Sequence, residues 1–467
     1  MADQPEEPSA AVPPPAVEMR RSPPGVVPFG AAVRAWFVIS LQTFGGPAGQ
    51  IAVMQRELVE ERRWIGQRRF LHALSFCMLL PGPEAHQLAV YSGWLLHGVR
   101  GGVVAGVLFV LPGMLAMLAL SALYVGLGDT TVIGALFTGL GAAVIPIVAQ
   151  AVVRLGRRAL HQPLLVGLAV AAFLALAVIG VPFPLVIAVA ALLGWFASRR
   201  LPATTEHGAS KDEGPPPVIP DDALHTEAPS GRRTARRLVG GLLVWLAPLL
   251  LVAVTVGGDS IYPTLGLFFA GAALVTFGGA YAVLAFVAQQ AVQVHGWVTA
   301  ADMARGLALA ETTPGPLIMV VQFVGFVGAH ADPAPFSPWI GAVVASLLVT
   351  WVTFVPSFLF IFLGAPHVER LRHHRALAGA LSGISAAVVG VIANLAVYVA
   401  LTTLFAAVRP GPLALLLPDP STVRPVPLAI AAVAALLIFV FRWSMLRTLG
   451  VCAVLGLAAG FAGLPVG

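Results

Sequence analysis

Two carboxylates stand out because each lies beside a Pro-Gly-Pro sequence inside an otherwise apolar stretch. Glu84 directly follows Pro81-Gly82-Pro83, and Glu311 lies three residues before Pro314-Gly315-Pro316. Ionisable groups at membrane depth are costly and are functional by default, and a carboxylate near an anion can hold a proton. We therefore expect Glu84 and Glu311 to be proton-coupling residues. For Glu84, an acid in the first turn of a helix is a purely structural alternative.

The Pro-Gly-Pro and Gly-Gly breaks could also bind an anion. Helices that begin after the breaks, near Ala48, Glu84, Tyr281 and Leu317, would direct free N–H groups and a partial positive charge towards the centre. A tetrahedral oxyanion suits such donors. The candidate substrate-binding residues are Gly45, Gly46, Pro47, Gly82, Pro83, Gln87, Tyr91, Gly278, Gly279, Thr312, Thr313, Gly315 and Gln322. The alternative is that the Pro and Gly residues only kink packed helices, and that the polar side chains bond between helices.

The composition places these residues in a membrane protein. Of the 467 residues, 58% are hydrophobic and only 10% are charged, whereas soluble domains have about 25% charged residues. This excludes a soluble globular enzyme, a nucleic-acid-binding protein and a disordered chain. The basic residues are all Arg except Lys211, and they lie in short runs between apolar stretches, which is typical of loops that flank membrane spans. Cys77 and Cys452 predict neither a disulfide framework nor a metal site, and we expect no cofactor.

An internal repeat relates the two halves of the chain. Three landmarks recur at an offset of 233 residues: 41–46 in 274–279, Trp64 in Trp297, and 81–83 in 314–316. A shared Gly-Gly alone would mean little, but three landmarks in ungapped register are hard to obtain by chance. The breaks therefore occupy matched positions in two copies of one unit.

The charges indicate that the two copies are inverted. Apolar stretches long enough to be candidate spans lie at 103–124, 132–153, 163–180, 184–198, 238–256, 338–363, 379–407, 427–441 and 446–464. The loop with Asp129 lacks Arg and is expected outside, whereas its repeat partner carries Arg370, Arg372 and Arg375 and is expected in the cytoplasm. The span at 238–256 is the extra crossing that inverts the second copy. This is the plan of secondary transporters with inverted repeats.

The segments 29–63 and 68–98 are apolar but interrupted, and both are flanked by Arg-rich loops. If these loops are cytoplasmic, each segment enters and leaves on one side as a hairpin. Their partners, 262–296 and 300–330, would enter from the outside. The rival interpretation is that each segment crosses once as a kinked helix, which leaves one basic loop on the wrong side. We favour hairpins, because non-helical backbone at membrane depth must line a cavity or be buried in protein.

The predicted fold is an all-α integral membrane protein with an inverted-topology repeat and broken or re-entrant helices. We divide the chain into a disordered cytoplasmic tail (1–27), a first transporter repeat (28–198), a cytoplasmic linker (199–237), and a joining helix with the inverted second repeat (238–467). The tail lacks the apolar core of a signal peptide. The sequence leaves open whether the protein forms a homodimer.

Several motifs together resemble one known family. They are LQTFGGP at 41–47, LLPGPEAHQLAVYSGWL at 79–95, FVLPG at 109–113 and TPGPLI with QFVGF within 313–326. The chain is identified by them as a member of the chromate ion transporter family in its long, two-domain form. The second half departs from the motif, because Ala280 stands where a Pro would follow Gly279.

The resemblance implies a multi-pass protein of the bacterial inner membrane that exports chromate, gives chromate resistance and draws on the proton gradient. Sulfate is then the expected competitor, and transport of sulfate or another oxyanion, including import, is the alternative function. A channel is a weaker alternative, since channels rarely need inverted repeats. We find no GxSxG, HExxH or phosphate-binding loop, so neither an intramembrane enzyme nor an ATP-driven pump is expected.

Overall fold

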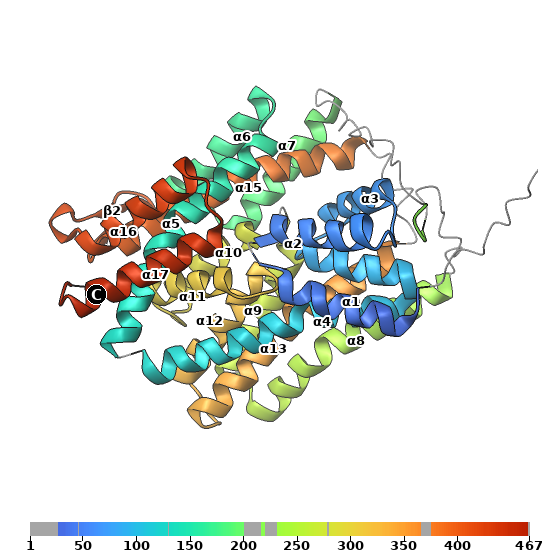
Figure 1. Ribbon diagram of the computed structural model, residues 1–467, viewed down its shortest axis with the longest axis horizontal. Coiled ribbons are helices and arrows are strands. Elements are labelled where there is room, and N and C mark those ends of the chain that lie inside the picture. The colour runs from blue at the N-terminus through green and yellow to red at the C-terminus, as the bar shows by residue number, and fades with distance from the viewer. Residues whose placement is uncertain are drawn as a thin grey trace, which may run out of the picture.

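The computed structural model describes residues 27–44, 46–128, 130–199, 216–219, 231–277, 280–365 and 375–465, and it is built mainly from helices (Figure 1). The N-terminal tail and most of the linker lie outside these residues, as does Asp129. Five helices are long and apolar enough to cross a membrane. The predicted all-α membrane fold is confirmed.

The first half of the chain, with its breaks, consists of seven α-helices. They are α1 (Phe29–Gln42), α2 (Gly46–Gln55, continued by a π-helix at Arg56–Glu61), α3 (Gln67–Leu79), α4 (Glu84–Leu127), α5 (Thr131–Ala159), α6 (Pro163–Leu174, then a π-helix at Ala175–Ile179) and α7 (Phe183–Phe196, then a 3-10 turn at Ala197–Arg199).

The second half follows the same order after one additional helix. It contains α8 (Gly231–Val256), α9 (Ile261–Val275), α10 (Ala280–Gln289, then a π-helix at Gln290–Val294), α11 (Ala300–Thr312), a 3-10 turn at Leu317–Met319, α12 (Val320–Ala331), α13 (Pro338–Gly364), α15 (Arg375–Leu404), β1 (Val408–Pro410), β2 (Leu416–Pro418), a 3-10 turn at Pro420–Thr422, α16 (Pro425–Ala435, then a π-helix at Leu436–Val440) and α17 (Met445–Phe461).

Helix α4 is two helices that fold back on each other. His97 and Gly98 have non-helical backbone angles, with φ of +61° at Gly98, a conformation that favours glycine. Beyond this reversal, Gly93 and Gly101 touch so closely that a Cβ on Gly93 would lie 2.4 Å from the Gly101 carbonyl oxygen. We call the parts α4a (84–96) and α4b (99–127). Helix α4a has 13 residues and is about 20 Å long, so it covers only part of a bilayer core of about 30 Å.

The broken segments are hairpins, as ring contacts across the breaks show. The rings of Phe76 in α3 and Tyr91 in α4a are 5.9 Å apart, and those of Phe268 in α9 and Phe286 in α10 are 5.4 Å apart. Each pair lies almost symmetrically about a break, which requires the two helices to run antiparallel. Gly306 in α11 packs in the same way on the Phe323 ring across Pro314-Gly315-Pro316.

Helices α1 and α2 also begin and end on one side. Nε2 of His97, at the reversal in α4, lies 2.8 Å from the carbonyl oxygen of Val27, just before α1. The other end of this segment leads through a short connection into α3, whose hairpin returns to the same reversal. Figure 1 shows α1, α2 and α3 grouped at one end of the molecule.

The second-half hairpins open on the opposite side. Helix α4b leaves the reversal and crosses the molecule to Tyr124 in its last turn, which donates a hydrogen bond to Asp302 and accepts one from Arg305 at the start of α11. Helix α13 runs back beside α4b, and its Phe358 ring contacts Gly106. Helix α4b follows the first-half hairpins along the chain, and α13 follows the second-half hairpins. The two sets of hairpins therefore approach the centre from opposite sides, as an inverted repeat requires.

One helix begins earlier than its predicted span. Helix α8 begins at Gly231, seven residues inside the predicted linker, because the helix continues beyond its apolar span through an Arg-rich turn. Strands β1 and β2 pair antiparallel in the connection between α15 and α16. In that loop the Ser421 hydroxyl and backbone N–H donate to Asp419, which lowers the pKa of the Asp419 carboxyl, and Arg409 pairs with it at 2.9 Å.

Candidate functional site

The Pro-Gly-Pro tips meet the Gly-Gly breaks of the opposite half through two matching hydrogen bonds. The Gly82 N–H donates to the Thr276 carbonyl at 2.8 Å, and the Gly315 N–H donates to the Thr43 carbonyl at 2.9 Å. Gly82 and Gly315 are repeat partners, and so are Thr43 and Thr276. Each half therefore supplies the hydrogen-bond acceptor for the Pro-Gly-Pro tip of the other half, and the four breaks converge on one centre.

Glycine is needed at both Pro-Gly-Pro tips for the same backbone reason. Gly82 has φ of +121° and Gly315 has φ of +97°, which residues with a Cβ rarely adopt. A Cβ on Gly82 would also lie 2.8 Å from the Gln87 side chain, and one on Gly315 would lie 3.4 Å from the Cα of Gly113 in α4b. At the tips, the glycine backbone, which has no side chain, therefore packs directly on the neighbouring helices.

Two glutamine side chains hydrogen-bond the backbone of the Pro-Gly-Pro tips. Gln87 donates to the Pro81 carbonyl at 2.6 Å, and Gln50 donates to the Gly315 carbonyl at 2.6 Å across the repeat boundary. The amide oxygen of Gln87 and the hydroxyl of Ser357, which lies beside Gly82, are buried and have no hydrogen-bond partner among the residues that the structure describes. Buried polar atoms are normally satisfied, so these two atoms are an acceptor and a donor that the described residues leave unused at the centre.

Glu311 is buried and held by one tyrosine. The residue is 3% exposed, and its Oε1 accepts a hydrogen bond of 2.6 Å from the Tyr281 hydroxyl. Its Oε2 is buried and has no partner among the described residues. Tyr281 lies in the first turn of α10 and also reaches α2, where its hydroxyl is 3.7 Å from the position of a Cβ on Gly46.

Glu84 is placed differently from Glu311. It is the first residue of α4 and follows Pro83 directly, so its charge faces the positive end of the helix. The residue is partly exposed, and its side chain makes no hydrogen bond with any residue that the structure describes. Glu84 is thus partly exposed and Glu311 is enclosed, although both lie beside a Pro-Gly-Pro tip.

The remaining predicted residues fall into three groups. The hydroxyls of Thr312 and Thr313 donate to the Leu309 and Ala310 carbonyls in α11, at 2.8 and 3.1 Å, so their protons are used within the helix. Tyr91 is 2% exposed and packs on Phe76 in the α3–α4a hairpin. Gln322 donates to the Met114 carbonyl of α4b at 3.0 Å, and its amide oxygen is buried and has no partner in the described part of the chain.

Pro47 and Pro83 lie at the starts of α2 and α4, where the missing N–H of proline is tolerated. Gly46, with φ of +73°, is the first residue of α2. Gly45, Gly278 and Gly279 lie outside the described residues.

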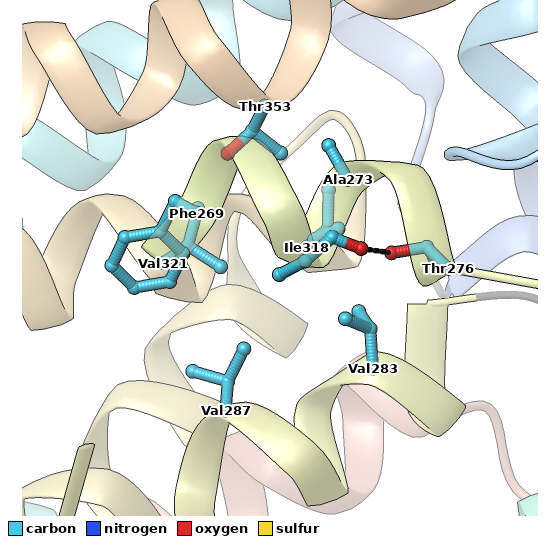
Figure 2. A pocket seen from close by; sticks show the side chains of 9 residues that line it. Phe269, Ala273, Thr276, Val283, Val287, Ile318, Val321 and Thr353 are labelled. Atoms are coloured by element: carbon cyan, nitrogen blue, oxygen red, sulfur yellow. Dashed lines mark hydrogen bonds between the residues drawn. The ribbon is translucent and has the colours of Figure 1, made fainter. Parts of the chain in front are cut away.

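A small apolar pocket lies beside the Gly-Gly break of the second half, between α9, α10, α12 and α13 (Figure 2). Its polar members are Thr276, whose hydroxyl donates back to Ala272 at 2.6 Å, and Thr353, which donates to Val349 at 2.7 Å. At the matching positions of the first half, Trp36 replaces Phe269 and Met54 replaces Val287. The pocket therefore reflects smaller side chains in the second half and offers no donors to an anion.

Sequence reasoning missed Tyr281, Gln50 and Ser357, which all lie at the tips. Tyr281 was noted only as the start of a helix. The repeat partner of Tyr281 is Ala48, and that of Gln50 is Val283. Because the polar side chain is present in only one half, a comparison of the two halves does not single out either residue. The structure also encloses His86 between the rings of Phe109, Phe354 and Phe358, which favours the packing role expected of a lone histidine.

The model of one protein family, described as Chromate transporter, matches residues 31–195 and 263–461. The chain belongs to the chromate transporter family. The two matched segments coincide with the two halves that the repeat and the hairpins define.

Three curated relatives from the comparison carry names of the same kind. A "Chromate transport protein" of Pseudomonas aeruginosa is 36% identical over 358 residues, which cover 75% of this chain and 76% of the relative. A protein of the same name from Cupriavidus metallidurans is 30% identical, over 76% of this chain and 79% of the relative. A "Probable chromate transport protein" of Synechococcus elongatus is 28% identical, over 75% and 79%. No solved structure matches the chain.

Proposed function

We propose that the protein exports chromate across the bacterial inner membrane, is coupled to the proton gradient and gives chromate resistance. The observation that carries the proposal is the meeting of four helix breaks at one centre, with Glu84 and Glu311 beside the two Pro-Gly-Pro tips. The names of the Pseudomonas and Cupriavidus relatives support chromate as the substrate.

The centre suits a tetrahedral dianion because its donors are backbone groups and neutral side chains. The first turns of α2 and α4 begin at the breaks and leave N–H groups unpaired within their helices. Such donors bind an oxyanion without a buried Arg that would hold it too tightly for release. Sulfate has the same shape and charge, so it competes for the same donors.

The direction follows from the membrane potential. A cell interior at negative potential favours the exit of anions by about 2.3 kcal/mol per charge per 100 mV, and a dianion gains this twice. Each proton that enters in exchange also moves down the membrane potential and adds to the free energy that drives export. A change of charge on Glu84 or Glu311 alters the affinity of the centre for a dianion, and by reciprocity the anion alters their affinity for protons. This is the linkage that a proton-coupled exporter needs.

The proposal is tested with everted membrane vesicles, in which an exporter accumulates substrate. We expect labelled chromate to accumulate, with a faster rate when the lumen is acid, and unlabelled sulfate to compete. Glu84→Gln and Glu311→Gln should each abolish chromate resistance while the protein still reaches the membrane.

Accumulation in right-side-out vesicles instead would indicate import. A rate that is indifferent to the pH gradient would remove the proton from the mechanism, and normal resistance in both Gln variants would contradict coupling through these carboxylates. Preference for sulfate over chromate would favour the alternative of a general oxyanion transporter.

A further inference from the structure

Tyr281 and Glu311 form a polar pair that exists in only one half of the molecule. Their repeat partners, at the same offset of 233 residues, are Ala48 and Met78. Both positions are thus apolar in the first half and both are polar in the second. The two residues lie 30 positions apart and on different hairpins, yet they differ from their partners together, as a pair that functions in contact would.

The contact itself shows why the two change together. The Tyr281 hydroxyl donates to Glu311 at 2.6 Å, and the second carboxylate oxygen has no partner among the described residues. A buried carboxylate is costly unless it is hydrogen-bonded, and Tyr281 supplies the one described hydrogen bond. Hydrogen bonds to an ionised group favour the ionised form, so the hydroxyl controls how readily this carboxylate takes up a proton.

Tyr281 also connects Glu311 to the other half. Its hydroxyl lies 3.7 Å from the position that a Cβ on Gly46 would take, beside the first residue of α2, where the break of the first half ends. The first turn of α2 is one of the helix starts at the breaks. A rotation of the Tyr281 side chain away from Glu311 therefore moves a group that lies beside this helix start.

Few other charges act on the pair. Arg154, near the end of α5, is the charged group that acts electrostatically on both Glu311 and Tyr281. At the other end of α11, Tyr124 donates a hydrogen bond to Asp302 and accepts one from Arg305, so these three residues bond one another. The titratable side chains described on α12, α15 and α17, which also pack on α11, are those of His330, Tyr398, Arg447 and Cys452, and none of them hydrogen-bonds Glu311.

We propose that Tyr281 is a positioning residue that stabilises the carboxylate of Glu311 and transmits its protonation state to the start of α2 in the opposite half. The inference rests on the proton coupling proposed above. It assigns this tyrosine-linked proton site to the second half alone, since Ala48 and Met78 cannot hold a proton. Glu84, whose side chain has no such donor among the described residues, is a separate carboxylate beside the tip of the first half.

The test is Tyr281→Phe, which removes the hydroxyl and keeps the ring. In everted vesicles, the midpoint of the pH profile of chromate uptake should move by about one to two units towards alkaline pH, as expected when one strong hydrogen bond to a carboxylate is lost. The stimulation by an acid lumen should fall accordingly. The matched control is Tyr262→Phe, which removes a hydroxyl that donates to Pro333 at 2.8 Å, away from Glu311, and should leave the profile unchanged.

A purely structural role for Tyr281 would lower the amount of protein or its rate without moving the profile, and this result would overturn the inference. Glu311→Gln should lose resistance because its transport is uncoupled, so its downhill exchange of chromate should not depend on pH, and adding Tyr281→Phe should leave that exchange unchanged. If Tyr281→Phe fails to reach the membrane, the pair Tyr281→Ala with Glu311→Met, which copies the first half, replaces it and should exchange chromate downhill without responding to the gradient.

The two proposals fail in different ways. A wild-type protein whose uptake ignores the pH gradient contradicts the proposed coupling and the role of Tyr281 with it. A wild-type protein that responds to the gradient, beside a Tyr281→Phe variant with the same pH profile, contradicts the role of Tyr281 alone.

Discussion

At the scale of single residues, the centre depends on backbone that only glycine forms without strain. Gly82 and Gly315 have φ of +121° and +97°, and each donates its N–H to the opposite half. A side chain at either position strains the backbone by roughly 1–2 kcal/mol and pushes on Gln87 or on α4b. The conformation of these two residues therefore contributes to both stability and transport.

We expect Gly82→Ala and Gly315→Ala each to lower the free energy of unfolding by at least about 1 kcal/mol and to reduce chromate transport. The control is Gly271→Ala in α9, where a Cβ meets nothing within 4 Å and where alanine is favoured in a helix by up to about 1 kcal/mol. Thermal unfolding in detergent measures the difference. Equal melting temperatures for all three variants would show that the tips tolerate a side chain.

The site could be predicted only in part from the sequence. Pro81-Gly82-Pro83 and Pro314-Gly315-Pro316 were predicted at the centre because both halves carry them. Thr312 and Thr313 were predicted there too, but their hydroxyls bond within their own helix. Tyr281 was missed because its role depends on a partner 30 residues away, across a break, and local pattern does not encode such pairings.

At the scale of elements, the hairpins explain why short helices can carry the site. Helices α3 and α11 have 13 residues each, about 20 Å, so each reaches from one side to near the middle of the bilayer. The Gly and Pro residues allow the chain to turn there. The sequence predicted these turns, and it also predicted a loop between the segment 68–98 and the span 103–124, where the structure has the reversal at His97–Gly98.

Cysteine cross-linking can test the hairpin of α9 and α10. Phe268→Cys with Phe286→Cys should cross-link readily, since the two rings are 5.4 Å apart. In a single kinked helix that crosses once, 18 residues would separate them by up to about 27 Å. The background should lack Cys77 and Cys452, and the two single-cysteine variants are the controls. Absence of the double-variant cross-link under oxidising conditions would favour a kinked crossing.

At the scale of the whole molecule, the described linker residues 216–219 lie on the side where the first-half hairpins open. Gly66, between α2 and α3, donates its N–H to Ile219 of the linker at 3.0 Å. Helix α15 starts on this side too, because its Gly379 packs on Gly194 near the end of α7. Its 30 residues are long enough to cross, so β1 and β2 lie on the opposite side. The cytoplasmic location of the first side stays a prediction from the Arg runs.

Labelling from one side of the membrane can test this orientation. Glu60→Cys and Leu413→Cys both replace exposed residues, and the two native cysteines are buried. In intact spheroplasts, a membrane-impermeant maleimide should label the cysteine at position 413 and should label the one at position 60 only after permeabilisation. The reverse pattern would place the N-terminal tail outside.

The paired hydrogen bonds at the tips have a consequence for how the protein assembles. Neither half can satisfy its own Pro-Gly-Pro tip, because the acceptor of each lies on the other half. During synthesis the Pro-Gly-Pro tip of the first half therefore lacks its hydrogen-bond acceptor until the second half has been inserted with inverted orientation. The linker guarantees that every first half meets one second half, and the tips then select the correct alignment.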